Sequence, residues 1–302
     1  MREFTIGKND KEMRLDKFLS KVMPDAGQGL IYKSLRKKRI KVNGKRITDG
    51  SLRLCEGDRL EIYCNDNLFL VLDGTKPITP IFDHILMVIY EDEHIIIMNK
   101  PSGLPSQAEP GEDSLEAEMR AYLMEKGDYN PKTENTFLPS LCHRIDRNTA
   151  GAVIGAKDAE SLRILNQKIK DKEIRKFYLC ETEGTPMPES GEIIGYLKKD
   201  EKRRRMVFSD TKVPGATSCH TRYRVLKPGK IATVEAELLT GRTHQIRAGF
   251  SHLGHPLVGD VKYGAQKNGK RTFQRLLAYK LVFDFTTESG CLTYLTGKEI
   301  IL

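Results

Sequence analysis

The chain has 302 residues, enough for two domains, and 39% of its residues are hydrophobic, which is typical of a globular protein. It contains no run near the roughly 18 consecutive apolar residues of a membrane helix, and no apolar segment typical of a secretory signal follows the first residue. We therefore expect a cytoplasmic protein without a membrane partner. The six cysteines lack the spacing of zinc ligands, so we interpret them as reduced, mostly buried thiols and expect no metal site.

The net charge of +9 is concentrated near the N-terminus. Residues 1–64 contain 16 Lys and Arg against 9 Asp and Glu, whereas the rest of the chain contains 34 against 32. A basic block in front of a nearly neutral body predicts a module that binds a polyanion, joined to a second domain.

The basic block also has the pattern of a small folded unit. Apolar residues at positions 15, 18, 19 and 22 predict a first helix, and residues 30–38 predict a second. Residues 39–47 alternate around Asn43-Gly44, which predicts a hairpin, and residues 58–63 predict a further strand. The basic residues of this unit that we expect to contact phosphates are Arg14, Lys33, Arg36, Lys37, Lys38 and Arg39.

These features resemble the αL, or S-four type, RNA-binding domain. The matching segments are Arg14–Leu19, the basic second helix, Ile40–Gly44 and the Gly57-Asp58 pair. The resemblance implies structured RNA as the partner. We assign residues 1–64 to this domain, residues 65–84 to a linker and residues 85–302 to the body.

The body mixes alternating segments with a few helical ones, which indicates an α+β fold with a largely antiparallel or mixed sheet. Asp113 is a plausible N-cap for the first of the helices. Strands are expected at 86–90, 94–98, 151–156, 176–180, 219–226, 231–239 and 280–285, and helices at 114–124, at 159–169 and from about residue 245. The basic stretch 198–205 is a hairpin tip or loop, and either contact with nucleic acid or a solvated surface would explain it.

The most informative stretch of the body runs from His143 to Lys157, where Asp146 lies between Arg144 and Arg147 and an apolar run follows. Nearby positive charge favours an ionised carboxylate, which can act as a base or a nucleophile. A structural Arg–Asp–Arg ion cluster beside a strand explains the same residues. Further along the chain, His244 either binds phosphate or orients the start of a helix.

The motifs of several other enzyme classes are missing. The sequence has no Gly-x-x-x-x-Gly-Lys phosphate loop, no Gly-x-Gly-x-x-Gly, no His-Glu-x-x-His and no Gly-x-Ser-x-Gly. Nucleotide-dependent, zinc-dependent and serine-hydrolase chemistry are therefore not favoured.

The stretch from His143 to Lys157 resembles the signature of the RluA-type pseudouridine synthases. Other segments match the same family in the same order; they are Tyr90–Leu104, Arg175–Leu179, Gly241–Arg247, Leu253–Asp260 and Tyr263-Gly264. The departures from the family pattern are Ile145, Ala150, Ala152, Cys180 and Leu277, none of which is a matched Asp, Tyr or Arg.

The resemblance implies a pseudouridine synthase core with a central cleft, which isomerises uridine in RNA to pseudouridine without cofactor or metal. It implies Asp146 as the catalytic carboxylate, Tyr178 stacked on the target base and Arg247 paired with Asp146. It further implies that Arg144 helps to occupy the space left by a flipped base, and that Arg147, Arg242 and His244 bind phosphates. Ile246 and Leu276 are expected as apolar walls.

The front domain favours 23S ribosomal RNA as substrate, and we expect a monomeric enzyme. Two alternatives stay open at this point: a tRNA substrate, and a non-catalytic RNA-binding factor in ribosome assembly.

Overall fold

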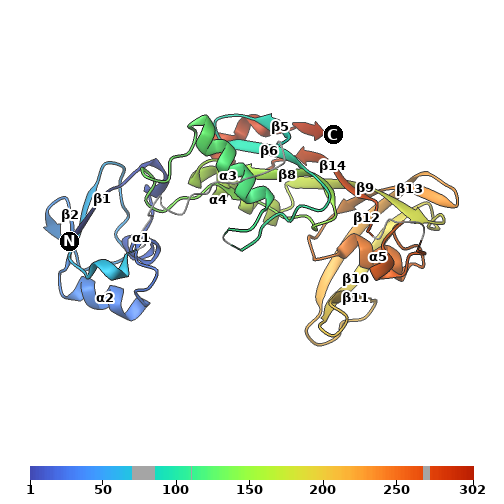
Figure 1. Ribbon diagram of the computed structural model, residues 1–302, viewed down its shortest axis with the longest axis horizontal. Helices are drawn as coiled ribbons and strands as arrows, with labels where there is room; N and C mark the ends of the chain where they lie inside the picture. The colour runs from blue at the N-terminus through green and yellow to red at the C-terminus, as the bar shows by residue number, and fades with distance from the viewer. Residues whose placement is uncertain (70–85, 110, 268–272) are drawn as a thin grey trace. The chain divides into compact units, whose positions relative to one another are not determined.

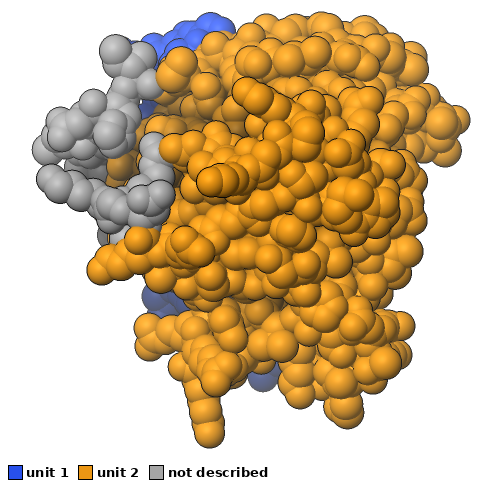
Figure 2. All heavy atoms as spheres, turned by 90° about the vertical axis from the view of Figure 1, so that its right-hand side faces the viewer, with its two compact units in different colours: residues 1–81, 120–140, 157–160 blue, residues 82–119, 141–156, 161–302 orange. Residues whose placement is uncertain are grey.

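The computed structural model describes residues 1–69, 86–109, 111–267 and 273–302. These residues form two compact units, coloured separately in Figure 2. The first comprises residues 1–69, 120–140 and 157–160, and the second comprises most of the remainder. The greater part of the predicted linker, residues 70–84, lies outside the described residues.

The first unit begins with the two predicted helices and the predicted hairpin. Its four strands form a sheet in the order β1-β4-β2-β3. The elements are β1 (Arg2–Thr5), η1 (Lys8–Asp10), α1 (Leu15–Val22), α2 (Gln28–Arg36), β2 (Ile40–Val42), β3 (Lys45–Arg46), β4 (Arg59–Ile62) and η2 (Asp66–Leu68). Asn43 and Gly44 both have positive φ, 52° and 76°, as a two-residue hairpin turn requires.

Two details of the first unit differ from the prediction. The second helix starts at Gln28 and ends at Arg36, because Lys38 takes a positive φ of 55° that a helix cannot continue. Phe69, which was expected in the linker, is buried in the core of the unit, with its ring 6.1 Å from that of Phe4. Apolar burial therefore continues up to the last described residue before the gap.

The second unit is built on one large sheet (Figure 1). Its strand order is β11-β10-β12-β13-β9-β14-β8-β6-β5, with β15 paired to β14 and β7 to β8. The strands are β5 (Val88–Glu91), β6 (Ile95–Lys100), β7 (Ser140–Leu141), β8 (Ala150–Ala156), β9 (Ile174–Glu183), β10 (Ser190–Asp200), β11 (Arg205–Ser209), β12 (Thr217–Lys227), β13 (Ile231–Leu238), β14 (Leu276–Phe283) and β15 (Glu299–Ile301). Most pairs are antiparallel, while β8 and β14 run parallel, so the expected α+β fold is confirmed.

Helices cover the sheet at several places. They are α3 (Leu115–Lys126), α4 (Ala159–Lys170), α5 (Gln245–His252), η3 (Val261–Tyr263) and η4 (Gly290–Leu295). Ile95 and Ile97 of β6 pack in one core with Leu165 of α4, whereas the space beside Gly155 is filled by Ile96 and by Met119 of α3. The central strands are thus buried on both faces, which explains their continuous apolar runs.

The N-cap of α3 is Ser114 rather than the predicted Asp113. The Oγ of Ser114 accepts a hydrogen bond of 3.2 Å from the backbone N–H of Ala117, the third residue of the helix. This bond satisfies one of the donors that a helix start leaves unpaired.

Strand β10 was not predicted, and the strand expected at 280–285 covers only the second half of β14. Gly191 and Gly195 interrupt the alternation of β10, and glycine is a weak strand former. Gly195 is needed because a Cβ there would lie 2.4 Å from the ring of Phe208 on the adjacent strand. In β14 the register shifts between Ala278 and Lys280, which breaks the period of two without ending the strand. The basic stretch 198–205 forms the end of the β10–β11 hairpin.

Candidate active site

Asp146 lies in the loop between β7 and β8, and the residues on both sides of it are fixed by the segment that follows β6. The Oγ of Ser106 donates to the carbonyl of Ile145 at 2.9 Å and accepts from its N–H at 3.1 Å. The Nζ of Lys100 donates to the carbonyl of Arg147 at 2.8 Å. The carbonyl of Asp146 itself accepts from the N–H of Thr149. The backbone that carries the carboxylate is therefore rigid.

Lys100 is fully buried, and the sequence analysis assigned it no role. Its ammonium also donates to the carbonyls of Pro101 and Leu104, so three carbonyls surround one charge. Burial lowers the pKa of Lys100 to about 8, although the negative charge of Asp146 opposes this shift. A lysine at the end of a strand that begins with four apolar residues is a signal for such a buried cation.

Arg247, on α5, is the direct partner of Asp146. Its Nη1 lies 3.1 Å from Oδ2 of Asp146. Its Nε and Nη2 donate to the two carboxylate oxygens of Asp260, at 2.7 and 2.9 Å. Burial alone would lower the pKa of Arg247, but the hydrogen bonds and charges of the two carboxylates raise it overall. Asp260 is 1% exposed, and the sequence analysis did not assign it a role.

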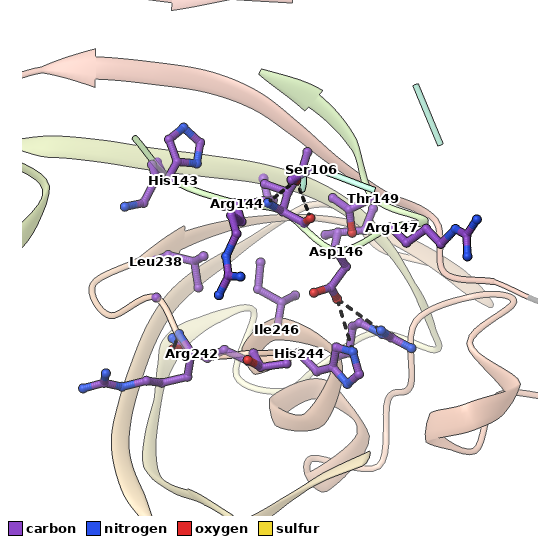
Figure 3. A pocket seen from close by; sticks show the side chains of 18 of the residues that line it. Ser106, His143, Arg144, Asp146, Arg147, Thr149, Leu238, Arg242, His244 and Ile246 are labelled. Atoms are coloured by element: carbon purple, nitrogen blue, oxygen red, sulfur yellow. Dashed lines mark hydrogen bonds and ion pairs between the residues drawn. The ribbon is translucent and has the colours of Figure 1, made fainter. Parts of the chain in front are cut away.

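The neighbours of Asp146 in the sequence do not pair with it. Arg147 turns away and donates from Nε to the carbonyl of Gly103 at 2.8 Å, and Arg144 extends towards Ile246 (Figure 3). The interpretation as a local Arg–Asp–Arg ion cluster is therefore wrong. A loop places successive side chains in different directions, so adjacency in sequence did not produce the ion pair.

Asp146 opens into a cavity of about 520 Å³, a size suited to a small ligand or a single base. Tyr178 of β9 lines this cavity and is 5% exposed. Burial and the nearby charge of Asp146 both raise the pKa of Tyr178, so its hydroxyl stays protonated at neutral pH. Ile246 and Leu276 line the cavity too, as expected of apolar walls. The cavity thus combines one carboxylate, one aromatic ring and apolar surface.

Arg242 and His244 border the same cavity from the segment before α5. Arg242 donates from Nε to the carbonyl of Ser218 and points away from Asp146 (Figure 3). The side chain of His244 makes no capping hydrogen bond to α5; its Nδ1 lies 2.8 Å from the hydroxyl of Tyr263, and its Nε2 lies 3.9 Å from Oδ2 of Asp146. His244 therefore occupies the N-cap position of α5 without capping the helix through its side chain.

The basic residues of the first unit form a separate surface. Lys33, Arg36, Lys37, Lys38 and Arg39 are all exposed at the end of α2 and in the turn that follows. Arg14 differs from them, because it forms two hydrogen bonds with Asp16, at 3.1 and 2.7 Å. Of the residues predicted to bind RNA in this unit, Arg14 alone is engaged in such a pair with a carboxylate.

Three further observations concern the described residues as a whole. They contain no group of three or more His, Cys, Asp or Glu side chains placed to hold a metal ion. None of their helices is long and apolar enough to cross a bilayer. The six thiols are free, but only Cys180 and Cys219 are buried and Cys55 is exposed, so the expectation of mostly buried thiols was wrong.

Comparison with known protein families identifies the family of this chain. The family model described as RNA pseudouridylate synthase matches residues 94–252, and the S4 domain model matches residues 13–60. This chain belongs to the RNA pseudouridylate synthase family. It is therefore an isomerase that acts on RNA, with an S4 RNA-binding domain at its N-terminal end, as the sequence motifs predicted.

Relatives support this assignment over almost the whole chain. An uncharacterised RNA pseudouridine synthase of Mycoplasma capricolum is 32% identical over 308 residues, covering 100% of this chain and 97% of the relative. The ribosomal large subunit pseudouridine synthase C of Rickettsia bellii is 34% identical over 265 residues, covering 84% and 83%. The solved structure of human RNA pseudouridylate synthase domain containing 4 has the same fold, with a TM-score of 0.57 at 20% identity over 72% of this chain and 87% of that one.

Proposed function

We propose that this synthase isomerises specific uridines of 23S ribosomal RNA to pseudouridine. Several relatives more than 30% identical to this chain are named as large-subunit ribosomal synthases, among them those of Rickettsia bellii and Vibrio parahaemolyticus. The S4 domain adds a second RNA-binding surface to the catalytic one. The proposal places the enzyme in the cytoplasm, where ribosomal RNA is assembled, and treats it as a monomer.

The observation that carries the proposal is the pairing of Asp146 with Arg247 inside a cavity that Tyr178 also lines. Isomerisation breaks the bond between N1 of uracil and C1′ of the ribose and forms a bond from C5 to C1′. C5 then loses its proton and N1 gains one, so the product is an isomer of uridine. In our proposal Asp146 is the catalytic residue, and the cavity holds the detached base while it turns. The arginine holds the carboxylate in place through a charge-assisted hydrogen bond.

The other cavity residues handle the base and the backbone. A uridine must leave its helix to reach Asp146, which costs a few kcal/mol. Tyr178 would stack on the flipped base, and Arg144, which is exposed and extends into the cavity, would occupy the space that the base leaves. Arg147 and Arg242 would bind phosphates beside the target. Their present acceptors are backbone carbonyls, so each guanidinium keeps further donors for RNA.

The S4 domain would bind the phosphate backbone through the basic end of α2, comprising Lys33, Arg36, Lys37, Lys38 and Arg39. Arg14 contributes less in this proposal, because Asp16 already satisfies two of its donors. Binding at two surfaces raises the overall affinity without new contacts at either one.

The decisive experiment measures pseudouridine in transcripts of 23S ribosomal RNA and of tRNA treated with the purified protein. Asp146→Asn keeps the size of the side chain and is expected to lower turnover by at least about 10⁴-fold while RNA binding persists. Full activity of Asp146→Asn would overturn the catalytic assignment. If only tRNA is modified, the substrate is tRNA and not ribosomal RNA. If the wild-type protein modifies neither RNA, the proposal is contradicted.

A further inference from the structure

A chain of polar contacts links Asp146 to the backbone of β11. The N–H of Met206 donates to the hydroxyl oxygen of Tyr263 at 2.8 Å. That oxygen lies 2.8 Å from Nδ1 of His244, and Nε2 of His244 lies 3.9 Å from Oδ2 of Asp146, as the dashed line in Figure 3 marks. The two hydrogen bonds fix the ring of His244, and its Nε2 faces Asp146 at a distance longer than a hydrogen bond.

The direction of these contacts determines the tautomer of His244. Tyr263 is 4% exposed, and its hydroxyl has one proton to donate. Because its oxygen already accepts from Met206, and because His244 Nδ1 is the only acceptor within reach among the described residues, the hydroxyl donates to Nδ1. The neutral imidazole of His244 then carries its proton on Nε2, the nitrogen that faces Asp146.

Arg247 and His244 both face the same carboxylate oxygen of Asp146. Arg247 Nη1 and His244 Nε2 approach Oδ2, at 3.1 and 3.9 Å. Within the described parts of the chain, Oδ1 of Asp146 has no hydrogen-bond or ion-pair partner. One oxygen is thus occupied by the protein, and the other is left for the substrate.

The backbone of His244 is itself held in an unfavourable conformation. Its φ of 53° and ψ of 21° lie in the left-handed region, which residues other than glycine rarely adopt. Tyr263, which contacts His244, is held in place as well. Ser251 Oγ donates to the carbonyl of Tyr263 at 2.6 Å, and the Arg247 guanidinium lies 4.9 Å from the centre of the Tyr263 ring. Such strain persists only where the surrounding contacts impose it.

We propose that His244 is a positioning residue for Asp146, held by Tyr263 as the Nε2–H tautomer so that, together with Arg247, it binds Oδ2 and directs Oδ1 at the substrate. This inference rests on the proposed catalytic role of Asp146. It replaces the expectation that His244 binds phosphate, because Nδ1 is bound to Tyr263 and Nε2 faces Asp146. For this role the 3.9 Å separation between Nε2 and Oδ2, which is longer than a hydrogen bond, must close when RNA fills the cavity.

The charges around His244 are consistent with a neutral ring. Burial lowers the pKa of His244, and the positive charges of Arg247 and Lys262 act in the same direction, while Asp146 and Asp260 oppose them. Protonation would also place a second donor on Nδ1, opposite the donating hydroxyl of Tyr263. Removing that hydroxyl is therefore expected to raise the pKa of His244 and to release the tautomer.

The first test measures the tautomer directly, without RNA. Long-range ¹H–¹⁵N correlation spectra of histidine-labelled protein distinguish the two tautomers, and His244→Gln identifies the signals of His244. Wild-type protein should show the Nε2–H form, and Tyr263→Phe, which keeps the ring beside Arg247, should show a mixture with a raised pKa. A matched control is Tyr223→Phe, which removes another buried hydroxyl beside α5 that donates to the carbonyl of Pro188. An Nδ1–H form in the wild type, or no change in Tyr263→Phe, overturns the proposal.

The second test separates positioning from RNA binding. Tyr263→Phe and His244→Leu should lower kcat by roughly 10- to 100-fold, the loss typical when a group that orients a reacting side chain is removed, with KM unchanged. His244→Gln keeps an N–H donor and should retain more activity than His244→Leu. If His244 instead binds phosphate, Tyr263→Phe and His244→Leu will raise KM and weaken RNA binding while kcat stays intact. That result would contradict the proposal. Failure of the wild type to modify RNA refutes the proposed function but leaves the tautomer result standing.

Discussion

Arg247 and Asp260 form a buried pair with two hydrogen bonds, and the pair holds the arginine at the position from which it contacts Asp146. Two parallel hydrogen bonds between a guanidinium and a carboxylate fix the distance between the two groups and the plane in which the guanidinium lies. The arginine is therefore oriented before substrate arrives, and Asp260 acts on the site without touching the cavity.

Asp260→Asn is expected to destabilise the fold and to lower activity together. Removing one partner of a buried pair costs about 3 to 5 kcal/mol, because the remaining charge is left uncompensated. Thermal or denaturant unfolding checks the first effect, and kcat on RNA checks the second. Asp210→Asn is the control, since its pair with His252 is on the surface, with Asp210 73% exposed, and is worth about 0 to 1 kcal/mol. Equal losses in both variants would contradict the role given to Asp260.

Lys100→Met is expected to loosen the loop that carries Asp146. Methionine matches the length of lysine but leaves the carbonyls of Pro101, Leu104 and Arg147 without their donor. At about 1 kcal/mol for each lost hydrogen bond, the free energy of unfolding should fall by about 3 kcal/mol. Activity should fall as well, because the Arg147 carbonyl adjoins Asp146. Faster amide hydrogen exchange in residues 144–149 checks the local effect, and unchanged exchange there would count against it.

Glu173 is expected to make stability depend on pH in the acid range. Its carboxylate accepts from Lys168 at 2.6 Å and from Thr286 and Thr287, and these hydrogen bonds, led by that of Lys168, lower the pKa of Glu173 from 4.5 to about 2. A carboxyl whose pKa is lower in the folded state stabilises the fold above about pH 4.5, and this contribution is lost as the pH falls towards 2.

The check is a series of unfolding curves between pH 2 and 6 for the wild type and for Glu173→Gln. The wild type should lose stability more steeply than the variant below about pH 4.5, since the variant has no carboxyl at this position to protonate. Parallel curves for the two proteins would show that Glu173 does not provide this pH dependence.

The basic end of α2 predicts a salt-dependent RNA affinity. Lys33→Ala and Lys37→Ala should each weaken binding for every RNA tested and lower the slope of log K against log salt by roughly 0.7 to 0.9. Lys170→Ala, which removes an exposed lysine at the end of α4, serves as the control and should leave the slope unchanged. A slope unaffected by the two α2 variants would place the phosphate contacts elsewhere.

The sequence by itself determined the family, the α+β class and the choice of Asp146, because these depend on local patterns. The hairpin at Asn43-Gly44 needs two residues that accept positive φ, and the helices follow apolar spacing. The basic charge of the first 64 residues is likewise a property of composition. Such features can be predicted from the sequence because each depends on residues only a few positions apart in the chain.

The resemblance implied the pairing of Asp146 with Arg247, but only the tertiary structure decided where the neighbouring charges point and what holds this pair in place. The two arginines next to Asp146 turn elsewhere, and its partner comes from a helix about 100 residues later in the chain, held in turn by Asp260. The contact of Tyr263 with His244 could not be predicted either, because side-chain directions in turns and short loops depend on backbone angles that no periodicity predicts. The pairing of β9, β14 and β8 in one sheet, together with the packing of α5 against β11 and β12, brings Asp146, Tyr178 and Arg247 to one cavity.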